Sequence, residues 1–139
     1  MIPAMDENQA TQMAVSQGSN FVWHELYAPS AAQAIEFYTK CLDFGTQEME
    51  MGEGMKYTML TRGGNAVCGV MDITEMKLEN VPPHWAAYLS VDDVDAKIKL
   101  CEENGAKLLH GPMDVPTIGR MALIMDPQGA TIWLFKGAM

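Results

Sequence analysis

The sequence predicts an α+β fold in which a strand–helix–three-strand unit occurs twice. Three observations support this prediction: the order of strand-like and helix-like segments repeats, the apolar stripes of two predicted helices match, and the chain ends in a clear β-hairpin. We therefore expect one domain, residues 19–139, built from two βαβββ repeats at about 19–72 and 83–137, which a linker at 73–82 joins.

The first repeat follows a polar stretch without periodicity, residues 1–18, which we expect to form a flexible tail. Phe21–Tyr27 is rich in aromatic residues and predicts a strand. Ser30, followed three positions later by Gln33, forms a capping box that predicts the start of a helix of about three turns. Three further strands are expected where apolar residues alternate or cluster between glycine turns, at 48–51, 55–61 and 66–72.

The second repeat shows the same order. His84–Val91 predicts a strand, and Asp93 is suited to cap the helix that follows. The next strand starts at Lys107–His110, and residues 111–117, with two prolines, are expected to form a loop. Gly119–Phe135 predicts a hairpin, because its central Asp-Pro-Gln-Gly supplies turn residues between two apolar runs. Aligning the two capping residues superimposes the helix stripes, with Ala31 on Val94, Ile35 on Ile98 and Tyr38 on Cys101.

The charge, the apolar runs and the cysteines of the sequence argue against several classes of function. The chain has 139 residues, of which 18 are acidic and 9 are basic, so its net charge of −9 would repel a phosphate backbone. No apolar run approaches the ~20 residues that cross a bilayer, and the N-terminus lacks the features of a signal peptide. The three cysteines have no CxxC spacing and are expected to be reduced. We therefore expect a cytoplasmic protein without nucleic-acid or membrane partners.

Several short motifs occur in register in the two halves. They are Trp-His-Glu-Leu at 23–26, Glu-Phe-Tyr at 36–38, Pro-Pro-His-Trp at 82–85, Val-Asp-Asp-Val-Asp at 91–95, and Gly-Arg-Met-Ala with Asp-Pro-Gln-Gly-Ala in the hairpin. Over about residues 20–137 the sequence resembles the glyoxalase / bleomycin-resistance / extradiol-dioxygenase group, the vicinal oxygen chelate superfamily. This resemblance implies curved mixed sheets around a central cup. It also implies a homodimer, in which the repeats pack within one chain or exchange between chains.

Enzymes of that superfamily hold a divalent metal with His, Gln or Glu side chains on the first and last strand of each repeat. The resemblance assigns these positions to Trp23, Cys68, Ala86 and Trp133. Trp, Cys and Ala are unsuited to a metal ion that prefers oxygen ligands, so we expect no metal site and no cofactor. A displaced divalent-metal site that uses Glu25 and His84 is the alternative.

The strand register decides which side chains face the cup. A shift by one residue would turn His24 inward and place charged Glu25 beneath a helix, which is costly, so we expect Glu25 to face inward. Glu25 and His84 are the candidate catalytic residues, because desolvation can bring a carboxyl pKa toward neutrality. The alternative is that Glu25 is paired with Arg120 or Tyr88. The expected ligand-binding residues are Trp23, Glu25, Tyr27, Cys68, His84, Tyr88, Met121, Leu123, Trp133 and Phe135.

These residues lead to a first functional hypothesis and three alternatives. The aromatic and apolar walls favour a protein that binds a small apolar or aromatic molecule in its cup, without the usual metal. One alternative is a metal-dependent lyase or dioxygenase with shifted ligands. Another is a metal-free enzyme that uses Glu25. In the third, the same side chains simply fill the cup, and the protein is a dimeric interaction module.

Overall fold

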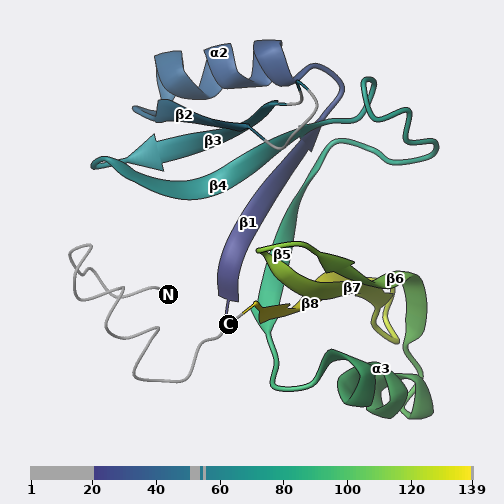
Figure 1. The fold of residues 1–139 in the computed structure, drawn as a ribbon. Coiled ribbons are helices and arrows are strands. Elements are labelled where there is room, and N and C mark those ends of the chain that lie inside the picture. Colours follow the sequence, from purple (N-terminus) through teal and green to yellow (C-terminus); the bar gives the residue numbers. More distant parts are fainter. Residues whose placement is uncertain (1–20, 51–53, 55, 139) are drawn as a thin grey trace, which may run out of the picture. The chain divides into compact units, whose positions relative to one another are not determined.

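A computed structural model describes residues 21–50, 54 and 56–138 (Figure 1). The tail expected at 1–18 lies outside the described residues, as do the first residue of the strand expected at 55–61 and most of the turn before it. By the contacts between its Cα atoms the chain divides into two compact units. We call residues 23–88 the N-terminal unit, and residues 89–139 together with 1–22 the C-terminal unit.

The N-terminal unit contains the whole first repeat except the first two residues of its first strand. Its strands follow the order β2-β3-β4-β1, with the first part of β5 beside β1. β1 and β4 run parallel, whereas β3 pairs antiparallel with both β2 and β4. Its elements are β1 (Phe21–Ala28), α2 (Ala31–Cys41), β2 (Gly45–Glu50), β3 (Lys56–Arg62), β4 (Asn65–Asp72) and β5 (His84–Ser90).

The helix of this unit begins where the capping box predicts. The Ser30 hydroxyl accepts a hydrogen bond from the Gln33 amide at 3.2 Å, and the Asp72 carboxylate accepts one from the Ala31 amide at 2.9 Å. Figure 1 shows α2 lying over β2, β3 and β4. The core beneath α2 consists of Leu26, Ala28, Leu60, Cys68 and Val70, with Ala31, Ala34, Ile35, Tyr38 and Phe44 packed against it.

The C-terminal unit contains the end of β5 and the rest of the second repeat, in the strand order β5-β8-β7-β6. Its further elements are α3 (Val94–Glu103), β6 (Lys107–Val115), β7 (Gly119–Met125) and β8 (Thr131–Gly137). The core on the α3 side consists of Val94, Ile98, Ala122, Ile124 and Leu134. Both repeats therefore have the predicted order of strand, helix and three strands, and the α+β fold is confirmed.

The predicted hairpin is the β7–β8 pair, and its turn has a clear physical cause. The Asp126 carboxylate accepts hydrogen bonds from the amides of Gln128 at 2.9 Å and Ala130 at 3.0 Å. Gly129 has a φ of 95°, a conformation that favours glycine. The aspartate thus satisfies the turn amides that no strand partner reaches.

The loop expected at 111–117 was wrong, because β6 continues to Val115. The pairing with β7 passes from His110 opposite Leu123 directly to Met113 opposite Met121, so two residues of β6 face one residue of β7. This is a β-bulge, and it accommodates Gly111 at a φ of 84° and Pro112, which has no amide hydrogen to donate. The Gly111-Pro112 pair therefore interrupts the ladder without ending the strand.

The border between the two units lies within β5, between Tyr88 and Leu89, whereas the expected linker at 73–82 lies inside the N-terminal unit. Among the described residues, no helix is long and apolar enough to cross a membrane.

Removing the cap of α3 tests the local basis of the second repeat. The Asp93 carboxylate accepts a hydrogen bond from the Ala96 amide at 3.0 Å. We expect Asp93→Ala to lower the free energy of unfolding by about 1 kcal/mol, measured by urea denaturation. Asp92→Ala is the matched control, since the Asp92 side chain is 85% exposed and should change stability by less than ~0.5 kcal/mol. Equal losses in the two variants would contradict the capping role.

Candidate functional site

The candidate site is built around Glu25, the only buried charged residue among those that the structure describes. Glu25 is 7% exposed and lies in β1 between Trp23 and Tyr27 on the face opposite α2, because its neighbour Leu26 packs into the core beneath that helix. The register that we expected for β1 is therefore the observed one. A carboxyl at such a position needs hydrogen-bond partners, since burial removes it from water.

Three neutral donors surround the Glu25 carboxyl. The Tyr57 hydroxyl and the Trp23 indole Nε1 both donate to Oε2, the latter at 3.2 Å, and the Tyr88 hydroxyl donates to Oε1 at 3.3 Å. The Trp23 indole also lies 3.1 Å from the Tyr57 hydroxyl oxygen. We call Glu25, Trp23, Tyr57 and Tyr88 the Glu25 cluster. All four residues belong to the N-terminal unit.

Gly69 leaves space for the Glu25 cluster because it has no side chain. Gly69 in β4 is the direct partner of Glu25 in β1. A Cβ atom added to Gly69 would lie 1.5 Å from the Tyr57 hydroxyl oxygen and 2.1 Å from Glu25 Oε2. Any side chain at this position would therefore occupy the space where the phenol meets the carboxyl.

Burial and hydrogen bonds set the protonation of the cluster. Desolvation raises the pKa of the Glu25 carboxyl, while the hydrogen bonds from Tyr57, Trp23 and Tyr88 lower it in part. Desolvation, together with the negative charge of Glu25, also raises the pKa values of Tyr57 and Tyr88. Both phenols therefore keep their protons and act as donors to Glu25. A buried carboxyl of this kind can hold a proton that an exposed one would release.

The hydrogen bonding extends from the cluster to the start of β5. Tyr88 also makes a side-chain hydrogen bond with Tyr27, whose ring is stacked on His84 with a centroid distance of 4.8 Å and an interplanar angle of 2°. The Nδ1 atom of His84 lies 2.7 Å from the Pro82 carbonyl oxygen, and it donates because a carbonyl only accepts. His84 therefore has a structural bond at its strand end, and its Nε2 atom is the one that a ligand could use.

The C-terminal unit has its own aromatic face. Its expected residues Met121, Leu123, Trp133 and Phe135 alternate with Ala122, Ile132 and Leu134 of the α3 side, and are therefore opposite α3. Trp133 is buried, and the His110 ring meets it edge to face with a centroid distance of 6.1 Å.

The structure bears on two sequence expectations, the role of Cys68 and the partner of Glu25. Cys68, expected to bind the ligand, packs with Leu26 and Leu60 beneath α2, on the face opposite Glu25. The cause is strand alternation: Gly69, one position further, is the residue that faces the carboxyl. Arg120, the other residue expected as a partner of Glu25, binds the carboxylates of Asp95 and Asp114 at 2.9 to 3.0 Å. The alternative partner, Tyr88, is the one observed.

Sequence reasoning missed Tyr57 and Gly69. Tyr57 lies in β3, and it reaches Glu25 only through the pairing of β3 with β4 and of β4 with β1. No local pattern in the sequence shows that pairing. A signal did exist for Gly69, because an isolated glycine within a strand often marks the close approach of another group.

The residues at the assigned metal positions do not fit a metal. In the described part of the chain, no group of three or more His, Cys, Asp or Glu side chains is arranged to hold an ion. The Trp23 nitrogen is a donor that is bonded to Glu25, Ala86 has no ligating atom, and the Cys68 thiol belongs to the core under α2. The displaced pair, Glu25 and His84, belongs to no such group in the part of the chain that the structure describes, and the Glu25 carboxyl already accepts hydrogen bonds from Tyr57, Trp23 and Tyr88.

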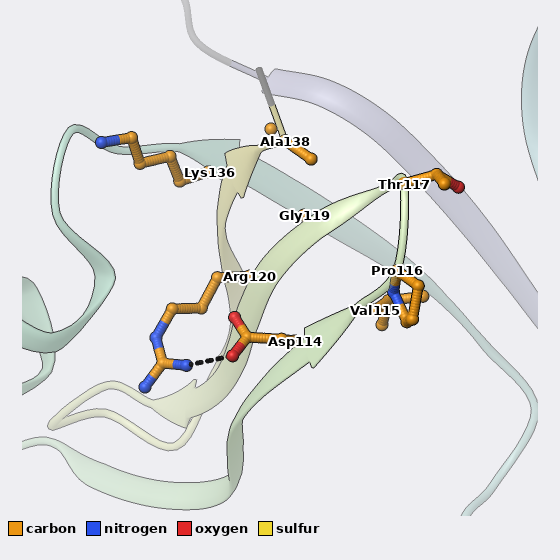
Figure 2. Close-up of a pocket in the computed structure, with 9 residues that line it drawn as sticks. Asp114, Val115, Pro116, Thr117, Gly119, Arg120, Lys136 and Ala138 are labelled. Carbon is orange, nitrogen blue, oxygen red and sulfur yellow. Dashed lines mark hydrogen bonds and ion pairs between the residues drawn. The ribbon is translucent and has the colours of Figure 1, made fainter.

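The C-terminal unit also has a surface hollow of about 320 Å³, lined by Thr117, Arg120, Lys136 and neighbouring residues (Figure 2). Figure 2 shows the ion pair between Arg120 and Asp114 in its wall, with the Lys136 side chain extending away from this pair. The guanidinium is therefore already neutralised by carboxylates. None of the residues expected to bind a ligand lines this hollow.

Comparison with known protein families gives a clear match. A family model described as Glyoxalase/Bleomycin resistance protein/Dioxygenase superfamily matches residues 20–134. CFP32, a candidate glyoxylase of Mycobacterium tuberculosis, is 33% identical over 124 residues, which are 89% of this chain and 46% of that protein. The anthracycline biosynthesis protein DnrV of Streptomyces peucetius is 32% identical over 131 residues, or 84% of this chain and 47% of that protein. This chain thus spans about half the length of these relatives.

Solved structures with the same fold include two methylmalonyl-CoA epimerases. The epimerase from Mycobacterium tuberculosis has a TM-score of 0.59 and 19% identity, with 87% of this chain and 89% of that chain covered. An epimerase in complex with methylmalonyl-CoA and NH4+ has a TM-score of 0.58 and 18% identity, with 86% and 94% covered. At these identities the likeness concerns the fold.

The contact between Gly69 and the cluster predicts a large effect of one methyl group. We expect Gly69→Ala to lower the free energy of unfolding by about 1–3 kcal/mol, because the Tyr57 and Glu25 side chains must move apart. Urea denaturation measures this loss. Gly137→Ala is the control, since its Cβ would meet only a Phe135 ring carbon at 3.8 Å, an ordinary contact. If Gly69→Ala is as stable as the control, the packing described for the cluster is wrong.

The raised pKa of Glu25 predicts a pH dependence of stability. Folded protein binds this proton more tightly than unfolded protein, so the stabilisation is fully present below the unfolded pKa of about 4.5 and is lost as pH rises through the folded pKa. We therefore expect the stability of wild type relative to Glu25→Gln to fall as pH rises above 4.5. Urea denaturation over a pH series measures the difference.

The control for loss of one carboxylate is Glu36→Gln, whose side chain is 74% exposed on α2. A stability difference between wild type and Glu25→Gln that stays constant, or that grows with pH, would show that the Glu25 pKa is not raised by folding.

Proposed function

We propose that this chain, which belongs to the glyoxalase/bleomycin resistance protein/dioxygenase superfamily, binds a small apolar or aromatic molecule without the metal site usual in that superfamily. The observation that carries the proposal is the Trp23 indole, which stands at an assigned metal position and donates its hydrogen to the buried carboxyl of Glu25. The Trp23 indole ring, next to a carboxyl whose hydrogen bonds come from neutral donors, is suited to a flat organic ligand. It is not suited to a hydrated cation.

The distribution of rings supports an aromatic ligand. Trp23 and Tyr57 are only partly buried, so part of each ring is available for contact, while Tyr27 and Tyr88 form the buried layer next to them. In the C-terminal unit, Trp133 and its neighbours on β7 and β8 form an aromatic and apolar face of the same kind. Aromatic side chains bind flat ligands through large contact areas and stacking.

The name of one relative bears on the ligand class. DnrV is named for the biosynthesis of anthracyclines, which are fused-ring aromatic compounds, and it shares 32% identity with this chain. This relationship supports an aromatic ligand. Because the chain spans about half of DnrV and of CFP32, the activities of those whole proteins are transferred here only as a proposal.

A metal-free reaction at Glu25 is the second candidate function. The observation in its favour is the raised pKa of a carboxyl in direct contact with a phenol, an arrangement that allows proton transfer to or from a bound molecule. The epimerase fold is compatible with such chemistry, though it does not assign it.

A cytoplasmic location and a homodimer complete the proposal. The location is supported by the absence of disulfides among Cys41, Cys68 and Cys101, and the homodimer by the family resemblance.

Metal analysis and thermal shift together test the proposed function. We expect purified protein to contain far less than one Fe, Mn, Ni or Zn per chain, and a chelator to leave its melting temperature unchanged. We also expect some compounds of a panel of flat aromatic molecules to raise that temperature, since a ligand at a hundred times its dissociation constant adds about 2.7 kcal/mol.

Two results would count against this function. The first is near-stoichiometric metal whose removal lowers the melting temperature. The second is a complete lack of stabilisation by every aromatic compound tested. Turnover of a bound compound that Glu25→Gln abolishes without loss of affinity would favour the metal-free enzyme.

A further inference from the structure

We propose that Met49 and Met71 make the face of the N-terminal unit opposite α2 pliable, so that it binds flat aromatic molecules of several ring outlines with similar affinity. This inference rests on the proposed function and names the breadth of its ligand class. It is carried by where the methionines of the strands lie and by the aromatic residues with which they pair.

The methionines of the described strands share one kind of position. In each unit they lie on the face opposite the helix, because they alternate with core residues along their strands or pair with residues on that face. They are Met49, Met59 and Met71 in the N-terminal unit, and Met113, Met121 and Met125 in the C-terminal unit. Among the described residues, the cores beneath the two helices contain no methionine.

The two faces of each unit therefore differ in how firmly their side chains are held. The cores beneath α2 and α3 consist mainly of Leu, Ile, Val and Ala, whose well-defined rotamers specify one packing arrangement. Methionine is unbranched and has three rotatable bonds, so it adapts to surfaces of different shape. The face that carries the methionines can thus adjust to a ligand while the core on the helix side keeps its packing.

In the N-terminal unit two of these methionines are strand partners of aromatic residues. Met49 of β2 lies opposite Tyr57 of β3, and Met71 of β4 lies beside Tyr27 of β1. Strand partners have their side chains on the same face, within reach of each other when the side chains are long. A thioether sulfur makes favourable contacts with aromatic rings at about 5 Å. The same sulfur atoms are suited to contact the rings of a bound molecule.

Exposure makes these two methionines available to a ligand. Met49 is 45% exposed, and Met71, Trp23 and Tyr57 are partly exposed. A flat molecule can therefore contact thioethers and rings on this face without reaching the buried carboxyl of Glu25. The methionines then determine how many ring outlines the face accepts.

Three aromatic alcohols that differ in ring outline test the inference. Naphthalene-2-methanol has two fused rings, anthracene-9-methanol has three in a line, and phenanthrene-9-methanol has three in a bend. Equilibrium dialysis measures their dissociation constants. A rigid apolar site discriminates by about tenfold or more against a ligand that differs by one methylene, so we expect the three constants of wild type to lie within about tenfold.

Replacing both methionines by leucine should narrow the ligand range. Leucine has a similar volume but a branched and stiffer side chain, so we expect Met49→Leu/Met71→Leu to fold and to widen the ratio of weakest to tightest constant at least about threefold. Met76→Leu is the control, since Met76 is 44% exposed in the turn after β4 and should keep the wild-type ratio. Melting temperatures show whether each variant folds. If the double variant does not fold, Met49→Leu on the outer strand β2 should widen the ratio in the same direction.

A second measurement reports contact directly. Protein labelled with ¹³C at its methionine methyl groups gives one signal per methionine, and the leucine variants assign the signals of Met49, Met71 and Met76. We expect each of the three compounds to shift the Met49 and Met71 signals more than the Met76 signal. A purely structural role of these methionines would not produce this difference.

The outcomes separate the inference from the function on which it rests. If none of the three compounds binds folded wild-type protein, the proposed function fails and the inference fails with it. If they bind but leave the Met49 and Met71 signals unchanged, the proposed function stands and the role of the methionines is overturned. That role is also overturned if wild type discriminates as strongly as a rigid site, or if the leucine variants keep the wild-type ratio.

Discussion

Burial of one carboxyl group among neutral hydrogen-bond donors is the constraint around which the N-terminal unit is arranged. Glu25 must exchange water for other partners, and Trp23, Tyr57 and Tyr88 provide them from β1, β3 and β5. Their meeting depends on four neighbouring strands, β3, β4, β1 and β5, and on the absence of a side chain at Gly69. The same hydrogen bonds that satisfy the Glu25 carboxyl also fix the orientation of the rings around it. Local packing and the chemistry of the site therefore depend on the same contacts.

The second repeat has the same architecture but no buried carboxyl group on the face opposite its helix. α3 covers a core like that beneath α2, and the opposite face carries Trp133 and other apolar side chains with no buried acid. Two repeats with matching helices and matching cores thus differ in the chemistry of their other face. A fold is shared more widely than a site, so the distinctive property of this chain lies in the Glu25 cluster.

Much of the architecture could be predicted from the sequence, because it depends on local signals. Ser30 and Asp93 mark the helix starts, and the Asp-Pro-Gln-Gly turn fixes the hairpin that places Trp133. The part that failed depends on pairing between distant strands. Tyr57 lies 32 residues from Glu25 in sequence. The position that the resemblance assigns, Cys68, is one residue away from Gly69, which faces Glu25. Since strand faces alternate, an error of one residue reverses the environment completely.

The bulge at Gly111 and Pro112 has a consequence beyond the site. β6 is the last strand in the order of its unit, so its outer side has backbone groups that another chain could pair with. A proline without an amide hydrogen and a local break in register make that side a poor template for an added strand. The residues that looked like the end of a strand thus make this edge less suited to extending the sheet by another strand.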